Sequence, residues 1–96
     1  MELEWDEEKR QKNLRERGID FASAASMDPS SVLTVIDSRS DYGEPRFIVF
    51  GFIEARLHVI CWTPRDGRMR VISLRKANER EQKAYFDASG SPSPSH

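Results

Sequence analysis

The chain has 96 residues, enough for one domain with a small core and too few for two lobes with a cleft between them. Charged residues make up 32% of it, yet the formal net charge is -1, so total charge neither favours nor excludes a nucleic-acid partner. The longest apolar run, Phe47 to Ile53, is far shorter than the roughly 18 residues of a membrane helix. The single cysteine, Cys61, excludes an internal disulfide, and the acidic N-terminus lacks a signal peptide's apolar core, so a reducing cytoplasm is expected.

A first helix is expected from Asp6 to about Arg17. Asp6 is a good N-cap, and Gly18 can adopt the left-handed conformation that ends a helix. Lys9, Asn13 and Arg17 recur every four residues and therefore share one face of this helix. That polar face is either solvated or forms the rim of a site.

A short second helix should follow from Phe21 to about Met27, before Pro29. Four strands come next, and the short turns between the last three make the sheet antiparallel. The strands are Ser31–Ile36, Arg46–Ile53, Arg56–Thr63 and a last strand that begins at Arg68. Gly51 suggests a bulge, and a helix rich in Ala, Glu, Gln and Lys closes the domain from Ala77 to about Phe86.

The sequence therefore predicts an α+β domain over residues 1–87, with two N-terminal helices, an antiparallel sheet of about four strands and a C-terminal helix. Residues 88–96 are rich in Ser and Pro, have nothing to bury and are expected to be a disordered tail.

Positive charge is concentrated in the sheet. The stretch from Glu44 to Lys76 holds seven basic and three acidic residues, a net charge of +4. Its last strand carries Arg68, Arg70, Arg75 and Lys76 around the hydroxyl of Ser73. This pattern is read either as an edge strand that charge protects against aggregation, or as a phosphate site, because guanidinium forks match phosphate oxygens.

The alternation of side chains complicates a single site. In a regular strand Ser73 and Arg75 share one face, whereas Arg70 lies on the other, so all three can meet only if the strand bulges or twists. Arg46, at the start of its own strand, is the expected companion across the sheet.

The residue types favour chemistry without a metal. His58 and His96 are the only histidines and no Cys or His cluster exists, so we expect neither a metal nor a cofactor. A ribonuclease that uses the ribose 2′-OH needs only proton transfer and neutralisation of phosphate charge. We assign phosphate neutralisation to Arg46, Arg70 and Arg75, proton transfer to Lys9, substrate orientation to Ser73 and Tyr85, and further RNA binding to Asn13, Arg17, Arg68 and Lys76.

The order and spacing of these residues resemble BrnT-type toxins of bacterial type II toxin–antitoxin systems. The resemblance rests on Trp5-Asp6, Lys9, Asn13, Gly18, Phe21, Glu44, Arg46, Gly51, Arg70-Val71-Ile72-Ser73, Arg75-Lys76-Ala77, Glu81 and Tyr85. It implies a RelE-like ribonuclease fold that cleaves RNA and arrests translation. It also implies a BrnA-like antitoxin partner, which would dimerise the toxin and contact DNA, so that the toxin itself reaches DNA only indirectly.

Two positions depart from that pattern. Such toxins often carry histidine where this chain has Arg17 and Trp62, so proton transfer would have to fall to another residue. Two alternatives stay open for the same basic face: a non-catalytic module that binds an acidic partner, and a nucleic-acid-binding domain without chemistry.

Overall fold

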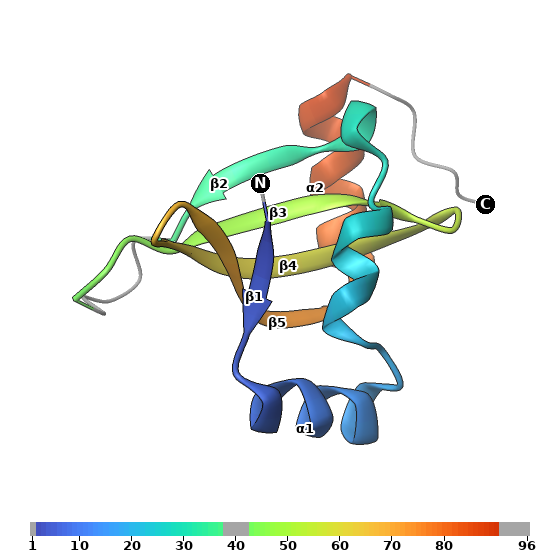
Figure 1. Ribbon diagram of the computed structural model, residues 1–96. Coiled ribbons are helices and arrows are strands. Elements are labelled where there is room, and N and C mark those ends of the chain that lie inside the picture. Colours follow the sequence, from blue (N-terminus) through green and yellow to red (C-terminus); the bar gives the residue numbers. More distant parts are fainter. Residues whose placement is uncertain (1, 38–42, 91–96) are drawn as a thin grey trace.

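The computed structural model describes residues 2–37 and 43–90 (Figure 1). Its elements are β1 (Leu3–Trp5), α1 (Glu7–Arg17), the 3-10 helices η1 (Phe21–Ser26) and η2 (Pro29–Ser31), β2 (Leu33–Ile36), β3 (Phe47–Ile53), β4 (Arg56–Arg65), β5 (Arg68–Lys76) and α2 (Glu79–Ser89). One sheet has the strand order β1-β5-β4-β3-β2. The α+β class and the C-terminal helix are confirmed, and none of the helices described is long and apolar enough to span a membrane.

The expectation of four strands was wrong, because β1 adds a fifth. It pairs in parallel with β5, from Leu3 beside Met69 to Trp5 beside Val71. Leu3 and Trp5 pack against the core while Glu4 lies between them. Three residues are too few to show a strand period, which is why the sequence pattern concealed this element.

The second N-terminal helix is also corrected. The segment after Asp20 forms the 3-10 helix η1, and η2 follows at Pro29–Ser31. The amide of Met27 donates to the carbonyl of Ala24, three residues back, as in a tight 3-10 turn. The first helix is confirmed: Asp6 accepts hydrogen bonds at its N-terminus, and Gly18 ends it with φ +70°.

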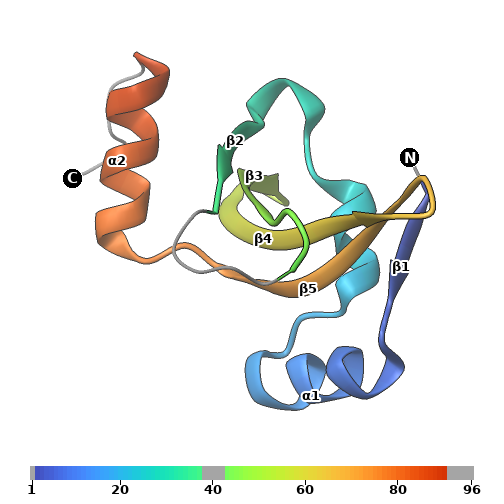
Figure 2. The ribbon, with the colours of Figure 1, turned by 90° about the vertical axis from the view of Figure 1, so that its left-hand side faces the viewer.

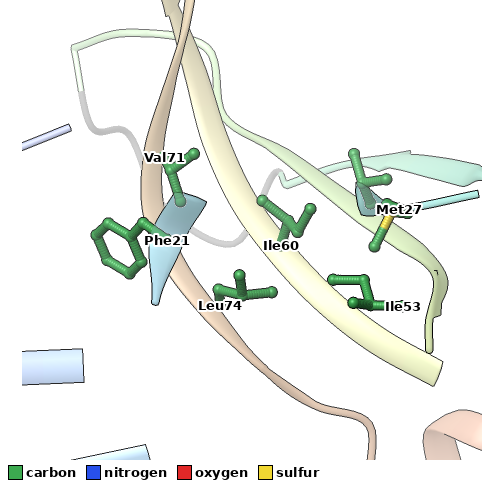
Figure 3. Close-up of a cluster of buried hydrophobic side chains, with 7 residues drawn as sticks. Phe21, Met27, Ile53, Ile60, Val71 and Leu74 are labelled. Carbon is green, nitrogen blue, oxygen red and sulfur yellow. The ribbon is translucent and has the colours of Figure 1, made fainter. Parts of the chain in front are cut away.

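The sheet has a core on each face. Seen edge-on, α2 stands on one side of it and η1 on the other (Figure 2). The first core cluster lies on the η1 side and comprises Phe21, Met27, Val49, Ile53, Ile60, Val71 and Leu74 (Figure 3). The second core cluster, on the α2 side, comprises Leu57, Val59, Ala77 and Tyr85. Both faces of β4 are therefore covered, as its apolar sequence indicates.

A bulge breaks the pairing of β4 with β5. Cys61 lies opposite Ser73, but Trp62 lies opposite Val71, so Ile72 is the extra residue. Because of this extra residue, Val71 and Leu74 are both buried in the first core cluster although they are three positions apart. The bulge thus lies in β5 and not at Gly51, where β3 pairs regularly with His58.

Helix α2 begins two residues later than expected. Asn78 is its N-cap, and its side chain accepts from the Glu81 amide while the Glu81 carboxylate accepts from the Asn78 amide. Ala77 stays in the connection, where it is buried and its amide donates to Leu57. The helix includes Ala88 and Ser89 of the expected tail, and residues 91–96 lie outside the described residues.

Gly51 serves close packing. A Cβ atom built on it would lie 2.5 Å from Sδ of Met27, which is buried in the first core cluster. We expect Gly51→Ala to destabilise the protein by about 1–3 kcal/mol, the usual cost of overpacking. Urea unfolding measures this cost. Adding Met27→Ala should make the double variant more stable than the two single costs predict, and strict additivity would contradict this packing.

Candidate functional site

The bulge in β5 places three of the expected site residues on one face of the sheet. Arg70, Ser73 and Arg75 lie opposite Thr63, Cys61 and Val59 of β4. Directly opposed residues of antiparallel strands project to the same side, and these three positions of β4 alternate regularly. Since Val59 belongs to the second core cluster, this shared face is the one that α2 covers. A regular strand would have placed Arg70 on the opposite face from Ser73 and Arg75. The bulge at Ile72 brings all three to the same face.

Each of the expected phosphate-binding arginines is paired with a carboxylate. The Arg75 guanidinium donates to both carboxylate oxygens of Glu81 at 2.7 Å, and Arg70 donates to Glu4 at 2.7 Å. Arg68 lies 3.1 Å from Glu2, and Arg46 lies 3.8 Å from Glu44. Three of these carboxylates lie outside the basic stretch from Glu44 to Lys76: Glu2 and Glu4 in the N-terminal segment, and Glu81 in α2. The face is therefore less positive than the strand sequence indicates, and phosphate would have to displace or join these carboxylates.

The pair formed by Arg75 and Glu81 is partly sheltered and structural. The guanidinium of Arg75, helped by the amide of Asn78, lowers the pKa of Glu81 below its usual value of 4.5. Glu81 also completes the N-terminal cap of α2. Arg75 is thus held in a fixed orientation at the point where β5 passes into α2.

A hollow of about 300 Å³ lies between α1 and the bulge, and we call it the α1–β5 hollow. It is lined by Lys9, Lys12, Asn13, Glu16, Arg17, Phe21, Ile72 and Ser73. Four expected site residues, Lys9, Asn13, Arg17 and Ser73, therefore meet here. In the part of the chain that the structure describes, Nζ of Lys9 and Nζ of Lys12 make no hydrogen bond or ion pair. Two ammonium groups are thus available beside the Ser73 hydroxyl.

Asn13 joins α1 to the bulge. Its Nδ2 donates to the carbonyls of Leu74 at 2.8 Å and Ile19 at 2.9 Å, and the residue is only 7% exposed. Because both acceptors are carbonyls, the amide orientation is fixed and Oδ1 faces Arg17, whose Nη1 donates to it at 3.4 Å. Both amide hydrogens are committed inside the protein, so Asn13 positions Arg17 and the bulge.

The remaining expected residues lie elsewhere. Tyr85 is buried in the second core cluster, and its hydroxyl donates to the carbonyl of Ser31 at 2.5 Å. Its ring packs edge-on against Phe52 and Phe86, which is the environment of a core tyrosine. Arg68 lies at the β4–β5 hairpin, and Lys76 lies at the other end of β5, opposite His58. The expected set therefore divides between the arginine-bearing face, the α1–β5 hollow, the core and the far end of β5.

His58 is the residue that sequence reasoning passed over. From the sequence it was considered only as a metal ligand, and no group of three or more His, Cys, Asp or Glu that could hold a metal is found among the described residues. The ring is 7% exposed, and its Nδ1 lies 2.8 Å from the carbonyl oxygen of Arg56. The available signal was its place in an otherwise apolar strand, between Leu57 and Val59.

One family model matches most of the chain. The family described as "Ribonuclease toxin, BrnT, of type II toxin-antitoxin system" matches residues 5–81, from the end of β1 to the cap of α2. The chain belongs to the BrnT family. No curated protein matches the chain. Membership in the BrnT family makes it a ribonuclease toxin whose system includes an antitoxin protein. All the expected site residues except Tyr85 lie within the matched range.

The low pKa of Glu81 gives a pH signature. A carboxyl whose pKa is lowered by folding stabilises the fold above its usual pKa, and this stability disappears as the pH falls through the lowered value. Wild type should therefore exceed Glu81→Gln in stability most strongly near pH 7, and the difference should shrink below about pH 5. Urea unfolding at several pH values measures it. A difference that stays constant down to pH 2 would show that the ion pair with Arg75 adds nothing.

Proposed function

We propose that this BrnT-family chain is a metal-independent endoribonuclease of the cytoplasm that arrests translation and is neutralised by a BrnA-like antitoxin. The observation that carries this proposal is the α1–β5 hollow, where Lys9 and Lys12 lie beside Ser73 and have no ion-pair partner in the described part of the chain. The BrnT family is one of ribonuclease toxins, so the substrate class is RNA. The lining of the hollow supports a reaction site between α1 and β5.

The reaction needs no group that this chain lacks. The ribose 2′-oxygen attacks the adjacent phosphorus, the bond to the 5′-oxygen breaks, and a 2′,3′-cyclic phosphate and a 5′-hydroxyl result. Lys9 is assigned the role of general base, which takes the proton of the 2′-hydroxyl, because it lines the hollow beside Ser73 and makes no hydrogen bond or ion pair with the described residues. The leaving 5′-oxygen receives a proton from an ammonium group or from water.

Charge on the phosphorane is stabilised from two sides. Arg17, held by Oδ1 of Asn13, and Lys12 supply positive charge from α1. Arg70 and Arg75 project from the neighbouring face of β5, where their carboxylate partners hold them in fixed orientations. Ser73, which belongs to both the face and the hollow, orients the substrate by a hydrogen bond. Tyr85 has no place in this scheme, because its hydroxyl is committed to Ser31.

One observation favours a different function. The ion pairs of Arg46, Arg68, Arg70 and Arg75 are what a structural or partner-binding surface would show. In that case the basic face would bind a protein partner without chemistry, and induced expression would not arrest growth.

Cleavage in EDTA tests the mechanism directly. Purified protein should cut single-stranded RNA in the presence of EDTA and leave 2′,3′-cyclic phosphate or 3′-phosphate ends. Lys9→Ala should slow this cleavage by roughly 10²–10⁴, the contribution of one general acid–base group. Lys83→Ala is the matched control, since Lys83 is an exposed lysine of α2 that pairs with Asp87. Products with 5′-phosphate ends, or equal rates in the two variants, would reject the assignment.

Substitutions in the pair of Arg75 and Glu81 distinguish a catalytic role of Arg75 from a structural one. Arg75→Ala should lower the rate by about 10²–10³, the loss seen for one preorganised donor, and Arg75→Lys should restore it only in part. Glu81→Gln breaks the same ion pair but keeps the guanidinium, so its rate should fall less than that of Arg75→Ala. Rates are compared at a temperature where all variants are folded. Equal losses in Arg75→Ala and Glu81→Gln would mean that only the ion pair matters.

A further inference from the structure

A second hollow, of about 630 Å³, lies on the other flank of α1, and we call it the His58 hollow. Leu14, Ile19 and Ile53 give it apolar walls. His58 and Lys76, which lie opposite each other on β4 and β5, line it together with Arg56. The catalytic scheme uses none of these residues.

The His58 ring presents one open hydrogen-bond position. A carbonyl oxygen can only accept, so the contact with Arg56 requires that Nδ1 carries the proton. In the neutral ring, Nε2 is then an acceptor, and within residues 2–37 and 43–90 it has no partner. The residue is more than nine-tenths buried. His58 lines the hollow and its Nε2 is not fully buried, so water or a ligand that donates a hydrogen bond can reach this acceptor.

The lining favours a nucleobase over a free anion. The carboxylates of Asp20 and Glu54 line the hollow beside the cations of Arg56 and Lys76, so its charge is mixed and a phosphate alone would be repelled in part. A base has apolar faces that suit the walls of Leu14, Ile19 and Ile53, and amino or imino hydrogens that suit an acceptor. Proteins that read single-stranded RNA likewise form hydrogen bonds to the edges of splayed bases.

We propose that the His58 hollow is a specificity subsite that binds one base of the RNA substrate through His58 Nε2, while Lys76 attracts the adjoining phosphate. This proposal rests on the proposed ribonuclease function.

The two hollows are close enough to hold one strand of RNA. They share α1, since Asn13 lines the α1–β5 hollow and its neighbour Leu14 lines the His58 hollow. Ser73 and Lys76 lie on the same strand three positions apart, about 10 Å along it.

Two amide substitutions distinguish recognition from structure. In His58→Asn the amide nitrogen can replace Nδ1 and keep the bond to Arg56, but nothing replaces Nε2. In His58→Gln the amide reaches the position of Nε2, but the bond to Arg56 is lost. The readouts are the base preference around cleavage sites in an RNA of random sequence and, by NMR, the shift of the His58 ring signals on adding each of the four nucleoside monophosphates.

The subsite predicts that wild type prefers one base and that His58→Asn lowers this preference about tenfold, as expected for one neutral hydrogen bond. His58→Gln should keep more of the preference than His58→Asn. Lys76→Ala should weaken binding of a 2′-O-methyl oligoribonucleotide, whereas the control Lys83→Ala should not.

Each outcome separates the two proposals. If RNA is cleaved but both His58 variants keep the wild-type preference and no nucleotide shifts the ring signals, the subsite is overturned and the ribonuclease function stands. If nucleotides shift the ring signals but wild type does not cleave RNA, the subsite stands and the proposed function fails. If only His58→Gln loses the preference, His58 acts through its bond to Arg56 and the subsite is overturned.

Discussion

The extra residue in β5 is the constraint on which the rest of the structure depends. Without it, alternation would place Val71 and Leu74 on opposite faces of the sheet, and one of them would leave the first core cluster. With it, both side chains are buried on the η1 side, and Arg70, Ser73 and Arg75 face α2 together. A single backbone irregularity therefore fixes both the packing of the core and the grouping of charged side chains.

The bulge is held in place by a side chain from far away in the sequence. Asn13, in the middle of α1, donates to the carbonyl of Leu74 just after the extra residue and to the carbonyl of Ile19 after the helix. The pairing of β1 with β5 ends at Val71. Beyond that residue, α1 contacts β5 in place of β1, through the hydrogen bond from Asn13 to Leu74. This arrangement explains how a helix with few apolar residues can stay attached: it is anchored by buried hydrogen bonds more than by an apolar stripe.

Much of the fold was predictable because its signals are local. Asp6 and Gly18 mark the ends of α1, and the turns at Glu54-Ala55 and Asp66-Gly67 have the positive φ angles of tight hairpins. The conformation of η1 and the existence of β1 were not predictable, since each depends on tertiary contacts made by very short segments. For the site, the sequence named Lys9, Asn13, Arg17 and Ser73, which the structure brings together at the α1–β5 hollow. It could not pair Glu4 with Arg70 across 66 positions, nor show that Tyr85 of α2 is buried in the second core cluster.

The parallel pairing of β1 with β5 has a consequence for how the molecule forms. The residues that must meet, such as Glu4 and Arg70, are separated by 66 positions, so the loop that closes between them is most of the chain. Contacts of this span carry a large closure entropy and form late in folding. A nascent chain that has emerged only through β4 has neither the strand that bears the arginines nor the wall of the α1–β5 hollow opposite Lys9. The proposed site is therefore absent for most of the chain's own synthesis and is assembled only when the last strand of the sheet joins the first.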